Sequence, residues 1–138
     1  MAIKNAFKDL QIASHQRVVV SWVGCSGKAS QYIDGYAAET LHGRTLPFAT
    51  GIKIAKPELT VLAVGWDGDG YGIGMGHFIH ACRRNLNITY IVFNNENYAL
   101  TTGQASPTTP LDIITKTTPD GNHLSPIDPI LLAQNSGC

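Results

Sequence analysis

The stretch LTVLAVGWDGDGYGIGMGHFIHACRRNLNITYIVFNN, residues 59–95, decides the fold. Residues 59–66 and 88–95 are short apolar runs rich in β-branched side chains, which predicts two buried strands. Between the runs, apolar side chains recur at the spacing of one helix face, at positions Met75, Phe78, Ile79, Cys82 and Leu86. This pattern predicts a helix that packs on a sheet. The order strand, helix, strand predicts a parallel sheet, so the expected fold class is α/β with helices flanking the sheet.

The same kind of pattern extends on both sides of this stretch. Residues 17–24 form another β-branched apolar run, and the helical periodicity of residues 3–10 predicts a helix before it. Residues 128–137 predict one more helix. The loop 96–110 has no periodicity, and a loop of that length in a compact domain is more often functional than idle. The chain has 138 residues, the usual size of one domain, so we expect residues 1–138 to form a single domain.

Composition excludes several classes of protein. Hydrophobic residues make up 43% of the chain and charged residues 14%, which argues against disorder and leaves part of the surface for another subunit to cover. Ten basic residues balance ten acidic ones, so no net positive field favours nucleic acid or an anionic membrane. The polar first residues do not resemble a signal peptide, and no apolar run reaches the roughly 18 residues that cross a bilayer. We therefore expect a cytoplasmic protein.

Acidic and amide side chains follow two of the predicted strands directly. They are Asp67, Asp69, Asn94, Asn95 and Asn97. In a parallel sheet, ligands bind outside the carboxyl ends of the strands, so these residues are neighbours if the two strands are adjacent. The glycines let the backbone approach a ligand, and a helix beginning near Gly72 would point free N–H groups to the same place. Carboxylate and amide oxygens suit Mg²⁺ bound beside a phosphate, which is the site that this pattern predicts.

Three common glycine motifs fit this sequence poorly. A dinucleotide fingerprint, G-x-G-x-x-G, needs glycine where Ile73 or Met75 stands. A P-loop around GCSGKAS needs glycine at Trp22 and serine or threonine at Ala29. An EF-hand loop that starts at the first aspartate meets Tyr71 at its third ligand position. A Mg²⁺-dependent nucleotide-diphosphate binder on a flavodoxin-like sheet stays open as a weaker alternative.

A thiamine diphosphate motif does fit. It consists of G-D-G and, roughly 25 to 30 residues later, N-N; here WDG at 66–68 is followed by Asn94 and Asn95. The segments GCSGK, TLHGRTLPFATGIKIAKPELTV, DGDGYGIGMGHFIHACRRN and YALTTGQASPTTP resemble the β subunit of the 2-oxoacid:ferredoxin oxidoreductases over nearly the whole chain. The resemblance implies the pyrophosphate-type thiamine domain of an enzyme that decarboxylates a 2-oxoacid such as pyruvate or 2-oxoglutarate. It also implies transfer of the acyl group to coenzyme A and of electrons to ferredoxin through an iron–sulfur cluster.

Carried over by position, the resemblance implies two sets of ligands. The Mg²⁺ ligands would be Asp67, Asn95 and the main-chain oxygen of Asn97. The diphosphate ligands would be Gly68 and Asp69, together with the backbone at Ala99 and Leu100.

The resemblance also implies residues that line the cofactor and meet the substrate. The lining residues would be Gly24, Cys25, Ser26, His42 and Gly43. Lys28, Arg44 and His42 are the candidates for a catalytic role. The side chains of Lys28 and Arg44 are cations that could meet a substrate carboxylate. Cys25 matches one cysteine ligand of the cluster.

Some positions depart from the family. Trp66 stands where the family usually has glycine, so close backbone approach to the diphosphate would require Gly65 to take over. Ala99 also replaces a usual glycine. A [4Fe–4S] cluster needs about four thiolates, yet the chain has three cysteines, widely spaced. We expect Cys82 to be a core residue and Cys138 an ordinary one. The remaining ligands would lie outside residues 1–138, so we expect a chain truncated at both ends.

The resemblance further implies a partner. In this family the glutamate that activates the cofactor comes from an α (or α/γ) subunit with the pyrimidine-binding domain. We therefore expect the isolated chain to be inactive and to act within a complex with that subunit, ferredoxin and coenzyme A. The alternative is a non-catalytic remnant that folds and associates but lacks a complete iron–sulfur site.

Overall fold

A four-stranded parallel sheet with the order β2-β1-β3-β4 forms the centre of the computed structural model, which describes residues 2–24 and 27–138. The strands are β1 (Arg17–Trp22), β2 (Tyr36–Thr40), β3 (Thr60–Trp66) and β4 (Ile88–Phe93). The three predicted strands are confirmed. The strand β2 has no sequence signal, because it lies at the edge of the sheet with most of its side chains exposed.

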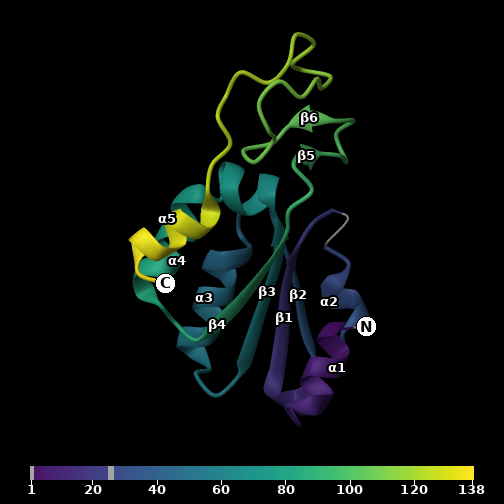
Figure 1. Ribbon diagram of the computed structural model, residues 1–138. Helices are drawn as coiled ribbons and strands as arrows, with labels where there is room; N and C mark the ends of the chain where they lie inside the picture. Colours follow the sequence, from purple (N-terminus) through teal and green to yellow (C-terminus); the bar gives the residue numbers. More distant parts are fainter. Residues whose placement is uncertain (1, 25–26) are drawn as a thin grey trace.

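Helices cover both faces of this sheet (Figure 1). One face carries α1 (Ala2–Asp9) and α2 (Ala29–Tyr32), and the other carries α3 (Thr45–Ala55), α4 (Met75–Arg84) and α5 (Pro129–Ser136). A 3₁₀ turn, η1 (Ser14–Gln16), precedes β1. The three layers confirm the predicted α/β class. None of the helices within the described ranges combines the length and the apolar character that a membrane span needs.

The two layers of core follow from the alternation of side chains along the central strands. On the α3 and α4 side, the buried residues are Val18, Val20, Leu46, Ala49, Val61, Ala63, Phe78 and Cys82. On the α1 and α2 side, they are Phe7, Val19, Ile33, Leu62 and Val64. Because β1 and β3 supply side chains to both layers, their sequences are nearly continuous apolar runs. Cys82 is 3% exposed, which confirms its predicted place in the core.

The carboxyl ends of β1 and β3 form a topological switch point. The chain leaves β1 for β2 through α2 on one face, and it leaves β3 for β4 through α4 on the other face. The two strands are adjacent, with Ser21 opposite Val64. The connections therefore diverge above this edge of the sheet, which opens a place for a ligand between them.

The segment between β4 and α5 extends beyond the same edge (Figure 1). The predicted loop 96–110 contains a small antiparallel pair, β5 (Asn97–Tyr98) and β6 (Gln104–Ala105). Asn122, 3% exposed, holds the end of this segment, since its amide donates to the carbonyls of Thr109, Pro110 and Leu124. Polar contacts rather than an apolar core thus shape this part of the chain.

Val20 tests whether β1 is central. Its side chain is 0% exposed between sheet and helices, so Val20→Ala should lower the free energy of unfolding by about 2 kcal/mol through lost burial and a residual cavity. Val23, 49% exposed just beyond β1, is the matched control. Val23→Ala should change the free energy of unfolding by less than about 0.5 kcal/mol. Urea unfolding followed by circular dichroism measures both. Equal losses would contradict the central position of β1.

Candidate functional site

Asp67 is the first residue after β3, and its side chain is fully buried. One carboxylate oxygen, Oδ1, accepts the main-chain N–H of Asn95 at 3.2 Å, and the other, Oδ2, accepts the hydroxyl of Thr108 at 3.0 Å. The Thr108 hydroxyl also lies 2.7 Å from Oδ1 of Asn94. A buried carboxylate requires such donors. Asp67 therefore joins the end of β3 to two parts of the segment that follows β4, as the predicted proximity of these residues required.

The side-chain amide of Asn95 completes a compact group of polar atoms. One of its terminal atoms lies 2.9 Å from Oδ1 of Asp67 and 3.0 Å from the main-chain oxygen of Asn97. With the amide nitrogen in this position, the group donates a hydrogen bond to each oxygen. With the amide turned by half a rotation, the Asn95 oxygen lies beside these two oxygens instead. The same atoms can thus serve either an internal hydrogen bond or a bound cation.

Asp69 faces a different neighbour, the connection between β2 and α3. It is 1% exposed. The main-chain N–H of Gly43 donates to its Oδ1, the Thr45 hydroxyl lies 3.4 Å from Oδ2, and Nδ1 of His42 lies 3.4 Å from Oδ1. Burial raises the pKa of the Asp69 carboxyl, and the Gly43 N–H and His42 oppose that shift. The Asp69 carboxylate therefore contacts the β2–α3 connection, while the Asp67 carboxylate accepts hydrogen bonds from the segment after β4.

A tight glycine-rich turn follows Asp67 and carries Asp69. A π-helical turn, η2 (Gly68–Ile73), begins directly after Asp67, and α4 begins only at Met75, so the predicted helix start near Gly72 is wrong. The backbone of Gly72 has φ −88° and ψ −108°, which separates the two helical segments. A Cβ atom at Gly68 would collide with the ring of Tyr98, whose hydroxyl donates to the Gly68 carbonyl at 3.2 Å. The turn therefore requires glycine to pack against β5.

Gly43 meets this turn from the other side. Its φ is +72°, and a Cβ there would lie 2.9 Å from the main-chain nitrogen of Gly74. A glycine is needed because both the left-handed conformation and the close approach exclude a larger residue. The loop after β2 thus reaches the turn after β3, and His42 and Gly43 come to lie beside Asp69.

Four aromatic rings gather at this edge of the sheet. Trp22, at the end of β1, stacks on Trp66, at the end of β3, with 5.0 Å between ring centroids. His42 lies 4.9 Å from Trp22 and 6.4 Å from Tyr98. The Trp66 side chain is 3% exposed, so it fills space at the start of the motif where the resemblance expects glycine.

Gly65, the glycine next to Trp66, is buried. A Cβ at Gly65 would lie 2.6 Å from the Tyr90 hydroxyl and 2.8 Å from Oδ2 of Asp69. Side chains therefore enclose Gly65 inside the protein.

Buried polar atoms without a hydrogen-bond partner concentrate at the same edge. Among the described residues, the unpartnered atoms are Trp22 Nε1, Trp66 Nε1, His42 Nδ1, Asn97 Oδ1 and the Tyr90 hydroxyl. Leaving a buried donor or acceptor unsatisfied costs roughly 1–3 kcal/mol. Such a concentration indicates a place where a ligand, an ion or water supplies the missing partners.

Four of the remaining predicted residues lie in exposed positions. Lys28 and Arg44 precede α2 and α3, and Ala99 and Leu100 lie in the turn between β5 and β6. Gly24 has φ +129°, and the next two predicted residues, Cys25 and Ser26, lie outside the described residues. In the described part of the chain, no three His, Cys, Asp or Glu side chains converge. A metal here would rely on one carboxylate with amide and carbonyl oxygens.

Sequence reasoning missed three residues that shape the site. Thr108 donates to Asp67, Thr45 lies against Asp69, and Trp22 stacks on Trp66. Thr108 belongs to the segment TTGQASPTT, which the resemblance covers without indicating which of its hydroxyl groups has a role. Trp22 lies in a predicted strand and Thr45 in another segment that the resemblance covers, but no pattern in the sequence pairs them with Trp66 and Asp69.

Comparison with known proteins places these features in one family. The model of the thiamine pyrophosphate enzyme C-terminal TPP binding domain matches residues 11–138. The chain is 50% identical to the 2-oxoglutarate synthase subunit KorB of Archaeoglobus fulgidus, over 99% of this chain and 49% of that protein. It is 49% identical to the 2-oxoacid:ferredoxin oxidoreductase subunit beta of Saccharolobus solfataricus, over 99% of this chain and 45% of that protein. The chain therefore spans about half the length of these curated relatives.

A solved structure agrees with the sequence relatives. The chain superposes with a TM-score of 0.93 and 41% identity on a chain of 2-oxoglutarate:ferredoxin oxidoreductase from Magnetococcus marinus, solved with 2-oxoglutarate, coenzyme A and succinyl-CoA bound. The match covers 96% of this chain and 46% of that one. At this identity the similarity extends beyond the general layout of an α/β sheet.

Asp69 gives a test of the electrostatics of the site. Burial raises the pKa of Asp69 above 3.8 in the folded state, so the folded protein binds this proton more tightly than the unfolded chain does. The free energy of unfolding therefore falls as the pH rises from the pKa of the unfolded state to that of the folded state. Asp69→Asn keeps an acceptor for Gly43 but removes the charge. Its stability relative to the parent should therefore increase from about pH 3.5 to pH 7, measured by urea unfolding. Asp9→Asn, at the exposed end of α1, should change stability by less than about 0.5 kcal/mol at neutral pH. A relative stability of Asp69→Asn that falls with rising pH would contradict the raised pKa.

Proposed function

Because this chain belongs to the thiamine pyrophosphate-binding family found in the β subunits of 2-oxoacid:ferredoxin oxidoreductases, we propose that Asp67, Asn95 and Asn97 hold Mg²⁺ for the diphosphate of that cofactor. The spacing of their oxygens supports this. Adjacent ligands in an octahedron with metal–oxygen bonds of about 2.1 Å lie about 3.0 Å apart. The Asn95 amide atom lies 2.9 Å from Asp67 Oδ1 and 3.0 Å from the Asn97 carbonyl oxygen. Rotation of one amide would therefore convert the internal hydrogen bonds into three metal ligands.

The main chain beside this group would hold the diphosphate. Gly68 and Asp69 begin the π-helical turn, and the first N–H groups of a helical segment have no partner within it. Ala99 and Leu100 would contribute their backbone from the exposed turn between β5 and β6. Mg²⁺ would neutralise charge between the diphosphate and the buried Asp67 carboxylate, which explains why an acidic residue stands beside an anion.

The residues after β1 and β2 would line the rest of the cofactor and meet the substrate. Gly24, Cys25 and Ser26 follow β1, and His42 and Gly43 follow β2. The His42 ring packs against Trp22, with its Nδ1 held beside Asp69. The roles of His42, Lys28 and Arg44 in catalysis, and that of Cys25 as a cluster ligand, stay predictions. The exposure of both cations is compatible with contact to a substrate carboxylate.

We infer that the whole protein oxidatively decarboxylates a 2-oxoacid to an acyl-CoA and passes the electrons to ferredoxin. The names of two relatives, a 2-oxoglutarate synthase subunit and a 2-oxoacid:ferredoxin oxidoreductase subunit, support this class of substrate. When bound, the thiamine cofactor supplies the electron sink. The residues of this chain would orient its diphosphate end, and a partner subunit would supply the activating glutamate and the pyrimidine-binding domain. Any iron–sulfur cluster would need thiolates beyond Cys25.

A second candidate function is a thiamine-type domain that associates with partners without catalysis. One observation favours it, the stacked indoles of Trp22 and Trp66 at the start of the motif. They occupy the switch point between β1 and β3, and their N–H groups have no partner among the described residues. If the pair stays in place, the backbone before Asp67 cannot approach a diphosphate closely.

Calorimetric titration of thiamine diphosphate into the 138-residue chain tests the first candidate. We expect binding with Mg²⁺ and none in the presence of a chelator. Asp67→Asn should weaken it at least about tenfold, because it removes the only carboxylate among the three proposed ligands. Asn87→Ala, exposed between α4 and β4, is the control and should bind as the parent does. Displacement by ADP with equal strength would favour the nucleotide alternative instead.

Trp66→Gly separates the two candidates. Under the first, the variant binds thiamine diphosphate about as well as the parent, or better. Under the second, the parent shows no binding and the variant gains Mg²⁺-dependent binding. Near-ultraviolet circular dichroism checks that the variant is folded. Absence of binding in both folded proteins would contradict the proposed ligand set in this chain.

A further inference from the structure

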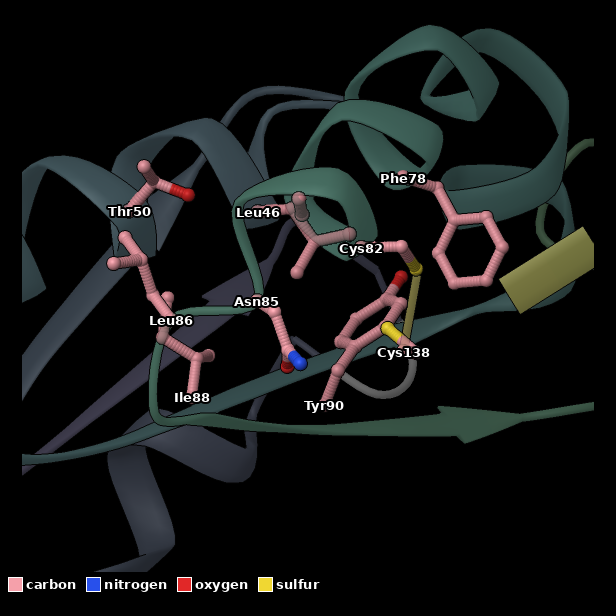
Figure 2. A pocket seen from close by; sticks show the side chains of 10 residues that line it. Leu46, Thr50, Phe78, Cys82, Asn85, Leu86, Ile88, Tyr90 and Cys138 are labelled. Atoms are coloured by element: carbon pink, nitrogen blue, oxygen red, sulfur yellow. The ribbon is translucent and has the colours of Figure 1, made fainter. Parts of the chain in front are cut away.

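Two cysteines meet beside the contact between α4 and α5. Cys82 lies in the last turns of α4, and Cys138 follows α5 directly. Both line a cavity of about 100 Å³ between these helices, α3 and β4. Figure 2 shows the two thiols on the same side of this cavity, next to the rings of Phe78 and Tyr90. Residues that are far apart in sequence thus place two sulfur atoms together.

The end of α5 fixes the position of Cys138. Gly137 takes the left-handed conformation, with φ +104°, and the Cys138 N–H donates to the carbonyl of Ala133 at 3.1 Å. This is the Schellman pattern of a helix end. A Cβ at Gly137 would lie 3.7 Å from the main-chain oxygen of Cys82, so the cap sits against α4. The cysteines are therefore neighbours because of a defined backbone turn.

The two thiols differ in access to solvent. Cys82 is 3% exposed, whereas Cys138 is exposed. Burial, followed by interaction with the Cys138 thiol, raises the pKa of Cys82 to about 12. Because Cys138 is the exposed thiol of the two, an oxidant would meet it first. Cys82 lies behind it as the second thiol.

We propose that Cys82 and Cys138 form a reversible intrachain disulfide when the protein meets a small-molecule disulfide oxidant. The Cys138 thiolate attacks one sulfur of the oxidant, whose S–S bond breaks and releases one thiolate. Cys82 then loses its proton and attacks the Cys138 sulfur, and the second half of the oxidant leaves as a thiolate. In total, two protein thiols lose two protons and two electrons, and the oxidant becomes two thiols.

The bond would join the two helices on one face of the sheet. The closed loop would contain β4 and the whole segment that carries Asn95, Asn97 and Thr108. A cross-link that spans so much chain restricts the unfolded state more than the folded one. Oxidation would therefore raise the thermal stability of the half of the domain that holds this segment. This inference rests on the packing of α4 and α5 and is independent of the proposed cofactor.

Peptide mapping after oxidation tests the proposal. The native 138-residue chain is incubated with oxidised glutathione, its free thiols are alkylated, and a tryptic digest is analysed by mass spectrometry. We expect a cross-linked peptide pair that contains Cys82 and Cys138 and disappears on reduction. The midpoint of thermal unfolding should rise by about 5 °C or more in the oxidised protein.

Two variants make the assignment specific. Cys25→Ser should keep the cross-link, and Cys138→Ser should lose both the cross-link and the rise in the unfolding midpoint. Cys138 is exposed, so its replacement should leave the fold intact. A glutathione adduct that persists on Cys138, a cross-link to Cys25, or full alkylation of Cys82 and Cys138 after oxidation would each overturn the proposal.

Discussion

Burial of the Asp67 carboxylate at the carboxyl end of β3 is the constraint on which the site depends. The side chain is 0% exposed, and a charge in that position has to be surrounded by donors. The chain supplies them from Asn95 and Thr108, which lie far from Asp67 in sequence and in the segment that extends beyond the sheet. That segment contributes little to the apolar core, so its position over the sheet depends on these polar contacts. The need to satisfy one carboxylate therefore also determines where the Asn95 amide and the Asn97 carbonyl lie.

The same edge of the sheet combines features that cost stability. Asp69 is buried with a raised pKa, and the indole N–H groups of Trp22 and Trp66 have no partner among the described residues. A protein tolerates such costs where a ligand offsets them on binding. The apolar layers around Val20 and Val64 lie directly below and supply the stability that allows them. Core and site are thus adjacent along the same two strands.

Sequence patterns found the elements whose signals are local. The strands β1, β3 and β4 are β-branched runs, and α4 has one clear apolar face, so their prediction needed no partner. Sequence patterns could not reveal β2, because its side chains are mostly exposed at the edge of the sheet. We also predicted no helix at α3, which carries Pro47 and Gly51. The start of α4 was misplaced because a π-helical turn comes first, and glycine-rich sequence gives no sign of that geometry.

By itself, the sequence determined the fold class and the residue types of the site, because hydrophobic periodicity and the spacing of WDG and Asn94-Asn95 are local properties. Only the tertiary structure decided which partner each of those residues contacts. It directed Asp67 to the segment after β4 and Asp69 to the loop after β2, and it brought Trp22 onto Trp66 and Cys138 to Cys82. These pairings depend on which strands are adjacent and where each connection turns. Long-range packing sets both, and no motif in the chain encodes them.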